Sequence, residues 1–151
     1  MSTHASSVNF RKLIKDLAEM YNFPIAEVVL TELIANSLDA KANVIKVYYD
    51  SKNYKLTVED FGQGMTESQF KEYHDFAADL KKRGTGIGFA GLGAKISFNI
   101  ASKVITQTLS EKFKGGSNWF LKSKKELIWE DLSTLESLNH KGTKVEVKWT
   151  P

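Results

Sequence analysis

Four stretches of the chain have the hydrophobic spacing or the terminal residues of α-helices. The clearest is residues 9–21, where hydrophobic residues recur every three or four positions. Pro24 suits the first turn of a second helix, and Thr66–Gln69 has the form of a capping box that starts a third. In the fourth we expect Ile96 and Ile100 to face inward. The predicted helices cover residues 9–21, 24–40, 66–80 and 93–101.

Short runs rich in β-branched and aromatic residues predict the strands of one sheet. Asp50–Asn53 separates the first two runs and has the composition of a hairpin turn. The later strands follow one another with little helix between them, so we expect a mixed, mostly antiparallel sheet with helices on one face. The predicted fold class is therefore α/β, a two-layer sandwich. The predicted strands cover residues 44–49, 54–59, 104–109, 118–122, 127–129 and 143–149.

Length and composition indicate an ordinary globular protein with a single domain over residues 1–151. The chain has 151 residues, 42% of them hydrophobic and 26% charged. No apolar run is long enough to cross a bilayer and no secretory signal is present, so we expect an intracellular protein, cytoplasmic or nuclear, without a membrane partner. The chain has no cysteine, which excludes disulfides and thiolate metal sites. Its net charge of +3 is mild and favours scattered solvated lysines over a dedicated nucleic-acid surface.

Three polar residues interrupt the otherwise apolar second helix. Glu32, Asn36 and Asp39 lie four and three positions apart, so they project from one face. Buried polar groups of this kind need a metal, a water or a polar ligand. Glu32 can polarise a water for attack on phosphorus, and the Asn36 amide oxygen suits Mg²⁺, which keeps waters and phosphate oxygens as its other ligands. Each residue alone also fits a simpler role: an ion-paired glutamate, a backbone-bonded asparagine and an acidic residue near a helix end.

Asp60 comes at the end of the second strand and precedes Gly62 and Gly64, which allow the backbone to turn tightly and approach a flat ligand. A carboxylate in this position can accept a hydrogen bond from an exocyclic amine such as that of adenine, and Met65 would be an apolar wall against the base. The alternative is an aspartate that stabilises a turn before glycines.

Five of the ten glycines lie between Lys81 and Gly93, which predicts an irregular and mobile segment. Its last glycines precede a helix whose N-terminal amides would face a phosphate chain. Lys95 would add positive charge to this site. The predicted phosphate-binding residues are Gly88, Gly91, Leu92, Gly93 and Lys95.

Two further observations concern single residues. Thr143 follows Gly142 and either bonds a base edge or simply begins the last strand. The three histidines, His4, His74 and His140, share no metal-ligand spacing, so we expect surface positions for all of them.

Together these motifs resemble those of the GHKL ATPase superfamily, which includes DNA gyrase B, the heat-shock chaperone ATPases, sensor histidine kinases and MutL-type repair proteins. Four motifs of that superfamily occur in the right order. They are E-x-x-x-N-x-x-D-A at residues 32–40, D-x-G-x-G at 60–64, G-x-x-G-x-G at 88–93 and G-T at 142–143.

The resemblance implies a Bergerat-type fold that holds ATP, with Mg²⁺ bridging Asn36 and the phosphates. It further implies that Glu32 is the general base, that Asp60 reads the adenine, and that residues 66–90 form an ATP lid. Residues 1–23, before these motifs, are expected to form an N-terminal helical segment. The sequence from Asn36 to Ala40 is similar to the MutL, type IIB topoisomerase and MORC branches. Lys95 also resembles a lysine of the MORC branch.

Three functions fit the resemblance. The first is a Mg²⁺-dependent ATPase that closes and forms a homodimer on binding ATP, within a DNA-associated or chaperone-like machine. The second is a protein kinase of the anti-sigma type. The third is a nucleotide-binding module with little catalysis that acts through partners such as DNA. Gyrase-like members carry a transducer domain after the ATPase domain, whereas this chain stops at Pro151 as an excised domain or a single-domain protein, so we expect slow hydrolysis.

Overall fold

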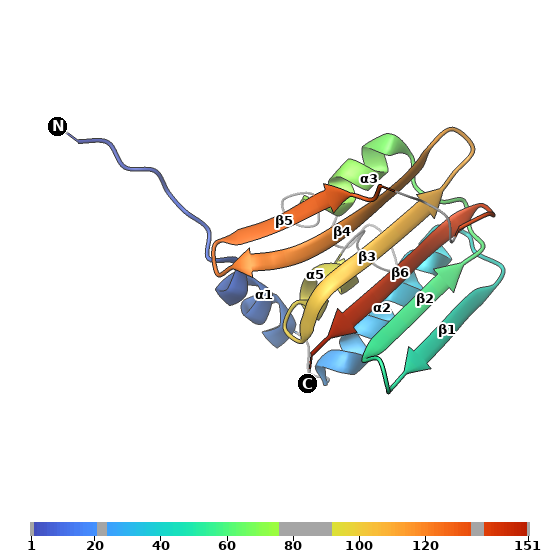
Figure 1. Ribbon diagram of the computed structural model, residues 1–151, viewed down its shortest axis with the longest axis horizontal. Helices are drawn as coiled ribbons and strands as arrows, with labels where there is room; N and C mark the ends of the chain where they lie inside the picture. The colour runs from blue at the N-terminus through green and yellow to red at the C-terminus, as the bar shows by residue number, and fades with distance from the viewer. Residues whose placement is uncertain (1, 21–23, 76–91, 134–137, 151) are drawn as a thin grey trace.

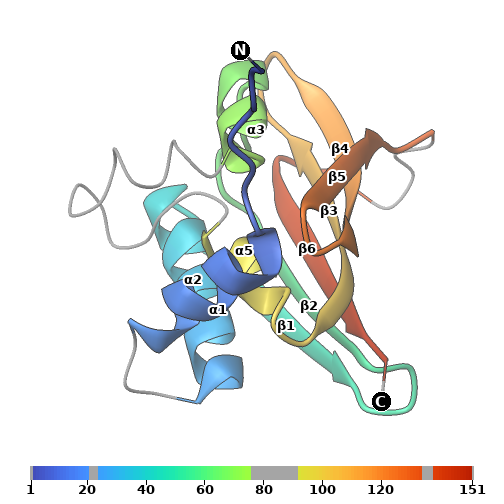
Figure 2. The ribbon, with the colours of Figure 1, turned by 90° about the vertical axis from the view of Figure 1, so that its left-hand side faces the viewer.

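The structure is a computed structural model, and it describes residues 2–20, 24–75, 92–133 and 138–150. Within these residues one layer is a sheet and the other is a group of helices that cover one of its faces (Figures 1 and 2). The helices are α1 (Phe10–Glu19), α2 (Ile25–Asp39), α3 (Glu67–Tyr73) and α5 (Leu92–Ser97). The expected two-layer α/β architecture is therefore confirmed.

The sheet has six strands: β1 (Ile45–Asp50), β2 (Lys55–Asp60), β3 (Ala101–Leu109), β4 (Lys114–Ser123), β5 (Glu126–Asp131) and β6 (Gly142–Trp149). They lie in the order β1-β2-β6-β3-β4-β5, so the C-terminal strand sits between β2 and β3. Every pairing among the described strands is antiparallel, and the parallel part of the expected mixed sheet is not found among them. The position of β6 brings Thr143 directly opposite Asp60.

Local sequence signals account for the helix starts. The Asn9 side chain accepts a hydrogen bond from the backbone N–H of Lys12 and caps α1. Thr66 and Gln69 form the expected capping box, in which each side chain accepts from the other residue's backbone N–H. Pro24 is the N-cap residue of α2, so the helix begins one residue later than predicted. Interactions within four residues therefore determine where these helices begin.

The core lies between the sheet and the helices. Because side chains alternate across each strand, one face of β2, β3, β4 and β6 presents a continuous hydrophobic layer to the helices. Full burial of each such side chain contributes about 1.5–3 kcal/mol, so this layer holds α1, α2 and α5 in place. The buried residues of the core, from the sheet and the helices together, include Ile14, Val28, Val29, Leu33, Val58, Ala94, Ile96, Val104, Trp119, Val145 and Val147.

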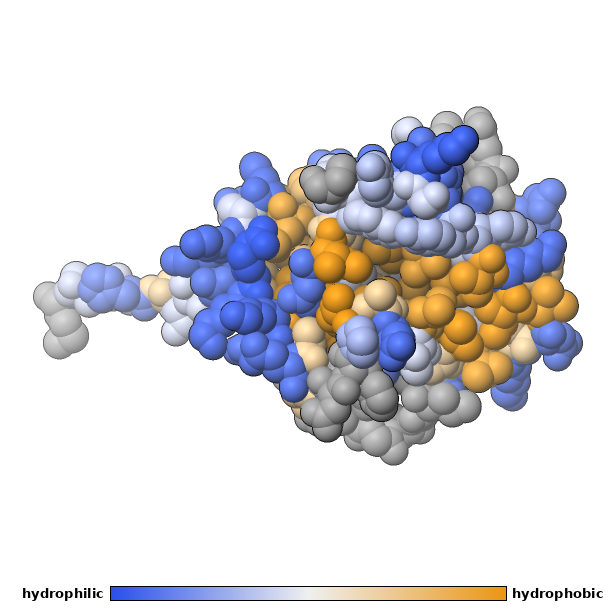
Figure 3. Space-filling view, turned by 90° about the horizontal axis from the view of Figure 1, so that it is seen from below, coloured by the Kyte–Doolittle hydropathy of each residue, from blue (hydrophilic) through white to orange (hydrophobic). Residues whose placement is uncertain are grey.

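The helices cover the β1 edge of the sheet less completely. Seen from below in Figure 3, hydrophobic residues gather on the side where β1 lies in Figure 1. Val47 and Tyr49 of β1 and Val44 just before it are exposed, and the Tyr49 ring stacks on Trp149. No helix among the described residues is long and apolar enough to cross a membrane.

Some predicted boundaries are wrong. Helix α5 ends at Ser97, and Ala101 already belongs to β3, so the fourth helix is shorter than expected. Ile96 is buried as predicted, but Ile100 lies beyond the helix end and is 42% exposed. Within the described residues the third helix ends at Tyr73, and its expected extension over residues 76–80 lies outside them.

Candidate functional site

The three polar residues of α2 become more exposed to solvent from Glu32 to Asp39. Glu32 is 8% exposed, Asn36 is half-buried and Asp39 is exposed. Helix α5 packs closely against α2 near Glu32, since a Cβ on Gly93 would lie 3.0 Å from the Glu32 Cβ. Gly93 thus permits this helix contact, in addition to the phosphate role expected of it. A ligand that enters from solvent would meet Asp39 and Asn36 before Glu32.

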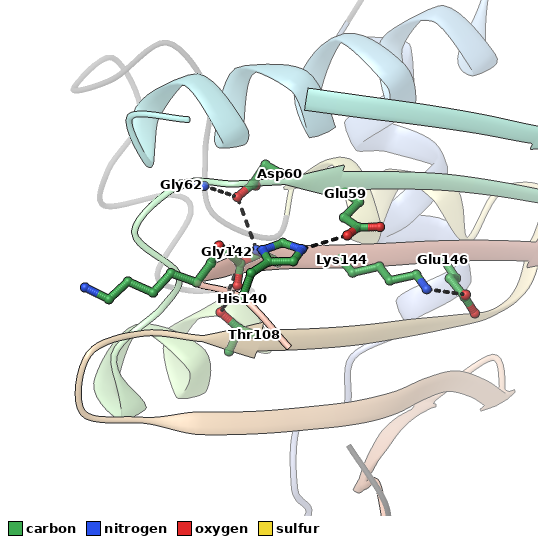
Figure 4. Close-up of polar contacts among 10 residues, drawn as sticks. Glu59, Asp60, Gly62, Thr108, His140, Gly142, Lys144 and Glu146 are labelled. Atoms are coloured by element: carbon green, nitrogen blue, oxygen red, sulfur yellow. Dashed lines mark hydrogen bonds and ion pairs between the residues drawn. The ribbon is translucent and has the colours of Figure 1, made fainter. Parts of the chain in front are cut away.

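Asp60 is the last residue of β2 and is 4% exposed. Three hydrogen bonds from three different elements hold its carboxylate. The Ser37 hydroxyl of α2 donates to Oδ2 at 2.8 Å, and the backbone N–H of Thr143 donates to Oδ1 at 3.1 Å. The backbone N–H of Gly62 also donates to Oδ1, at 3.0 Å (Figure 4). Since a carboxylate has about four acceptor sites, these three donors leave about one site for a ligand.

The sequence analysis missed two residues at this site, Ser37 and Thr108. The Ser37 hydroxyl also lies 3.3 Å from the backbone oxygen of Leu33, so it bridges α2 and β2. Thr108 of β3 accepts from the backbone N–H of Met65 at 2.8 Å, and its hydroxyl lies 2.9 Å from that of Thr143. In the sequence, only its place within the motif of residues 32–40 marks Ser37 as a possible site residue. Nothing in the sequence marks Thr108.

The glycines around Asp60 are required by the backbone. Gly64 has φ = +71°, and a Cβ there would lie 2.1 Å from the Leu109 carbonyl oxygen. Gly142 has φ = +139°, and a Cβ there would lie 1.9 Å from the Asp60 carbonyl oxygen. A side chain at Gly64 would push the loop after β2 away from β3, and one at Gly142 would push β6 away from the end of β2. The site therefore depends on close backbone contact as well as on its polar groups.

Lys95 does not reach solvent. It is 0% exposed, and its ammonium donates to the backbone oxygen of Asp75 at 2.8 Å. It therefore connects α5 to the segment that follows α3. Leu92 begins α5, whereas Gly88 and Gly91 lie outside the described residues. The phosphate roles of these residues stay predictions.

The surface position expected for His74 is wrong. Its Nδ1 lies 2.8 Å from the Phe70 carbonyl oxygen, its Nε2 lies 2.7 Å from the Ser117 hydroxyl, and its ring stacks on Trp129. Burial lowers the pKa of His74 to about 4, so the ring is neutral near pH 7. His4 is exposed as expected.

His140 is also more enclosed than expected. Its Nε2 lies 2.7 Å from a Glu59 carboxylate oxygen, and its ring stacks on Phe61 with centroids 3.8 Å apart. Glu59 precedes Asp60 in β2, and its side chain points to the opposite face of the sheet. His140, which contacts Glu59, therefore lies on the opposite face of the sheet from the Asp60 carboxylate.

The donor set near Glu32 suits a cation that needs few protein ligands. Among the described residues, no three His, Asp or Glu side chains are grouped to hold a metal ion. A half-buried amide one turn from a buried carboxylate fits Mg²⁺, because this ion completes its shell with water and phosphate oxygens. It would not suit Zn²⁺, which requires three or four protein ligands.

Comparison with known proteins agrees with this geometry. The family model of histidine kinase-, DNA gyrase B- and HSP90-like ATPases matches residues 23–144. The chain belongs to this family. The match includes α2, the loop after Asp60 and the start of β6, so it confirms the resemblance to the GHKL superfamily. No curated protein matches the sequence significantly. The similarity to the MORC, topoisomerase and MutL branches stays a prediction.

As a member of this family, the chain is an ATP-binding module. In this GHKL domain, α2, the end of β2 and the start of β6 bring together Ser37, Asp60 and Thr143, although Ser37 and Thr143 are far apart in sequence.

Proposed function

We propose that this GHKL domain binds ATP with Mg²⁺ at the Asp60 site and hydrolyses it slowly. The observation that carries the proposal is the Asp60 carboxylate, which is buried and held by three donors yet retains an acceptor site. An ATP base with an exocyclic amine would supply a fourth donor to this carboxylate.

The proposed adenine-binding role of Asp60 has more structural support than the proposed phosphate-binding roles on α2. Donors from α2, β6 and the loop after β2 fix Asp60 in one orientation, so its remaining lone pair has a defined direction. An exocyclic amine is a suitable donor for that lone pair. Met65 is half-buried near the end of the same loop, where its side chain can contact the face of a base.

The phosphate end of the site rests on α2. When bound, Mg²⁺ would supply charge neutralisation for the phosphate oxygens, and Asn36 would hold it through the amide oxygen. Glu32 lies one turn deeper, where it would accept the proton of the attacking water. Its burial favours this role, since a carboxylate with few competing waters binds the reacting water more strongly.

The wider role follows only from the resemblance. We propose a conformational or dimerisation switch driven by ATP, in a machine that works with DNA or as a chaperone. Family members use the same fold as ATPases or as kinases, so the acceptor of the phosphoryl group must be measured.

The first test is calorimetric titration of the wild type and of Asp60→Asn with Mg·AMP-PNP. Asparagine has the same shape, its amide oxygen can accept from Gly62 and Thr143, and the Ser37 hydroxyl can rotate to accept from its NH₂ group. Folding should survive, whereas the acceptor for the base is lost. We expect affinity to fall by about 1.5–3 kcal/mol, roughly 10- to 150-fold.

The affinities of the wild type and of Asp60→Asn for Mg·AMP-PNP are compared in one buffer. Equal affinity of both proteins would show that Asp60 does not contact the base. Absence of binding by the wild type would contradict the proposed function as a whole.

A further inference from the structure

His140 is fixed on three sides. Its Nε2 lies 2.7 Å from a Glu59 carboxylate oxygen, and its Nδ1 lies 2.7 Å from the backbone oxygen of Lys141 (Figure 4). Its ring stacks on Phe61 with the two planes 12° apart. The side chains of His140 and Glu59 are both largely buried. Three neighbours thus hold one imidazole at the start of the segment that leads into β6.

Both ring nitrogens face acceptors. A neutral imidazole carries one N–H and satisfies one of them, whereas an imidazolium carries two and satisfies both. Burial opposes the charge, but the hydrogen bonds to Glu59 and to the Lys141 carbonyl, with the nearby charges of Glu59 and Asp60, outweigh it and raise the pKa of His140 above its usual value. The protonated form is therefore the one that fits this position.

The other charged groups around the ring come from β1 and β6. The Lys46 ammonium of β1 lies 5.2 Å from the centroid of the Phe61 ring on which His140 stacks. Lys144 of β6 pairs with Glu146 at 3.6 Å. Glu59 is accordingly the carboxylate in direct contact with the imidazole.

The enclosed histidine and the Asp60 site share the same backbone. Glu59 and Phe61 are the two chain neighbours of Asp60, and His140 lies three residues before Thr143, whose N–H donates to Asp60. Gly142, between them, has φ = +139° and passes so close to the Asp60 carbonyl that a Cβ would not fit. A shift of His140 would therefore change the alignment of the Thr143 N–H with the Asp60 carboxylate.

We propose that protonated His140 is a positioning residue that holds the backbone of residues 140–143 against β2 and makes nucleotide affinity depend on pH. The inference rests on the proposed ATP site. When pH rises through the pKa of His140, the ring loses one N–H and leaves either the Lys141 carbonyl or Glu59 facing a nitrogen lone pair. The Thr143 donor is then less well fixed, and nucleotide affinity falls. We expect a decrease of about two- to tenfold, which corresponds to one hydrogen bond.

The test is titration with Mg·AMP-PNP between about pH 5.5 and about pH 8.5, where an ordinary or raised histidine pKa lies. Wild type and His140→Gln are measured together, because the ratio of their dissociation constants cancels ionisation of the nucleotide phosphates. The wild type should bind about two- to tenfold more tightly at low pH, and the two proteins should converge at high pH.

Two further variants make the test specific. His140→Arg supplies a permanent planar cation that can stack on Phe61 and donate to Glu59, so it should keep tight binding across the range and lose the pH dependence. His4→Gln is the matched control, because His4 is exposed in the N-terminal segment and should leave the wild-type profile unchanged. His74, with a pKa of about 4, does not titrate in this range.

An NMR titration of the wild type gives an independent readout. If protonation strengthens binding, linkage requires a higher His140 pKa in the Mg·AMP-PNP complex than in the free protein. An equal pKa in both states, or a variant-to-wild-type ratio that is constant with pH, would overturn the inference even if His140→Gln folds poorly. A wild type that binds at no pH would instead overturn the proposed function and this inference together.

Discussion

Ser37→Ala tests whether the bond between α2 and Asp60 stabilises the site. The Ser37 hydroxyl is buried and donates to the Asp60 carboxylate at 2.8 Å. A hydrogen bond to a charged group contributes about 1.5–3 kcal/mol, and the better helix propensity of alanine recovers up to about 0.5 kcal/mol. The net loss should be about 1–2.5 kcal/mol, which lowers the Tm of a domain of this size by about 2–10 °C.

The assay is urea unfolding followed by circular dichroism, with thermal unfolding alongside. Ser97→Ala is the matched control, because Ser97 is also buried in a helix but its hydroxyl contacts the Ala94 carbonyl in the same helix. That variant should lose about 1 kcal/mol or less.

A double-mutant cycle with Asp60→Asn isolates the pair. In the Asp60→Asn background the bond is no longer charge-assisted, so Ser37→Ala should cost about 1 kcal/mol less than in the wild type. Equal losses in both backgrounds, or a loss for Ser37→Ala no larger than that for Ser97→Ala, would refute the assignment of this bond as a stabilising link.

Two other predictions concern catalysis and pH. Glu32→Gln should keep Mg·AMP-PNP binding but lower phosphate release by about 10²–10⁴-fold in single-turnover assays; unchanged turnover would exclude Glu32 as the general base, and radioactive phosphate retained on protein would indicate a kinase. His74 has a lowered pKa in the folded state, so its contribution to stability is present above its unfolded pKa near 6.5 and is lost as pH falls toward about 4. Urea unfolding at several pH values in this window should therefore show stability falling more steeply for wild type than for His74→Gln, and equal slopes would contradict the burial of a neutral His74.

Several features of the fold could be predicted from sequence because their causes are local. The Asn9 cap, the capping box at Thr66 and Gln69, and the start of α2 after Pro24 all depend on residues within four positions of one another. The end of α5 could not be predicted in the same way. Ile100 continues the helical hydrophobic spacing, but the chain turns after Ser97 to enter β3, and this tertiary requirement overrides the local pattern.

In the candidate site, too, some residues could be predicted from local sequence and others only from the tertiary structure. Residues 32–40 and Asp60 could be identified from motif spacing, because they match motifs of the family to which the chain belongs. Ser37, Thr108 and His140 could not, since their partners Asp60, Met65 and Glu59 lie 23, 43 and 81 positions away in sequence. A serine, a threonine or a histidine acquires such a role only when the sheet order places its partner beside it.

The sequence by itself determined the family, the two-layer fold class and the chemistry available on α2 and at Asp60, because these depend on the types of residues and their short-range spacing. The tertiary structure decided which residues contact and position these side chains. Insertion of β6 between β2 and β3 brings the Thr143 N–H to Asp60 and His140 to Glu59. Since hydrogen bonds act only over about 3 Å, residues so distant in sequence interact only after the chain has folded.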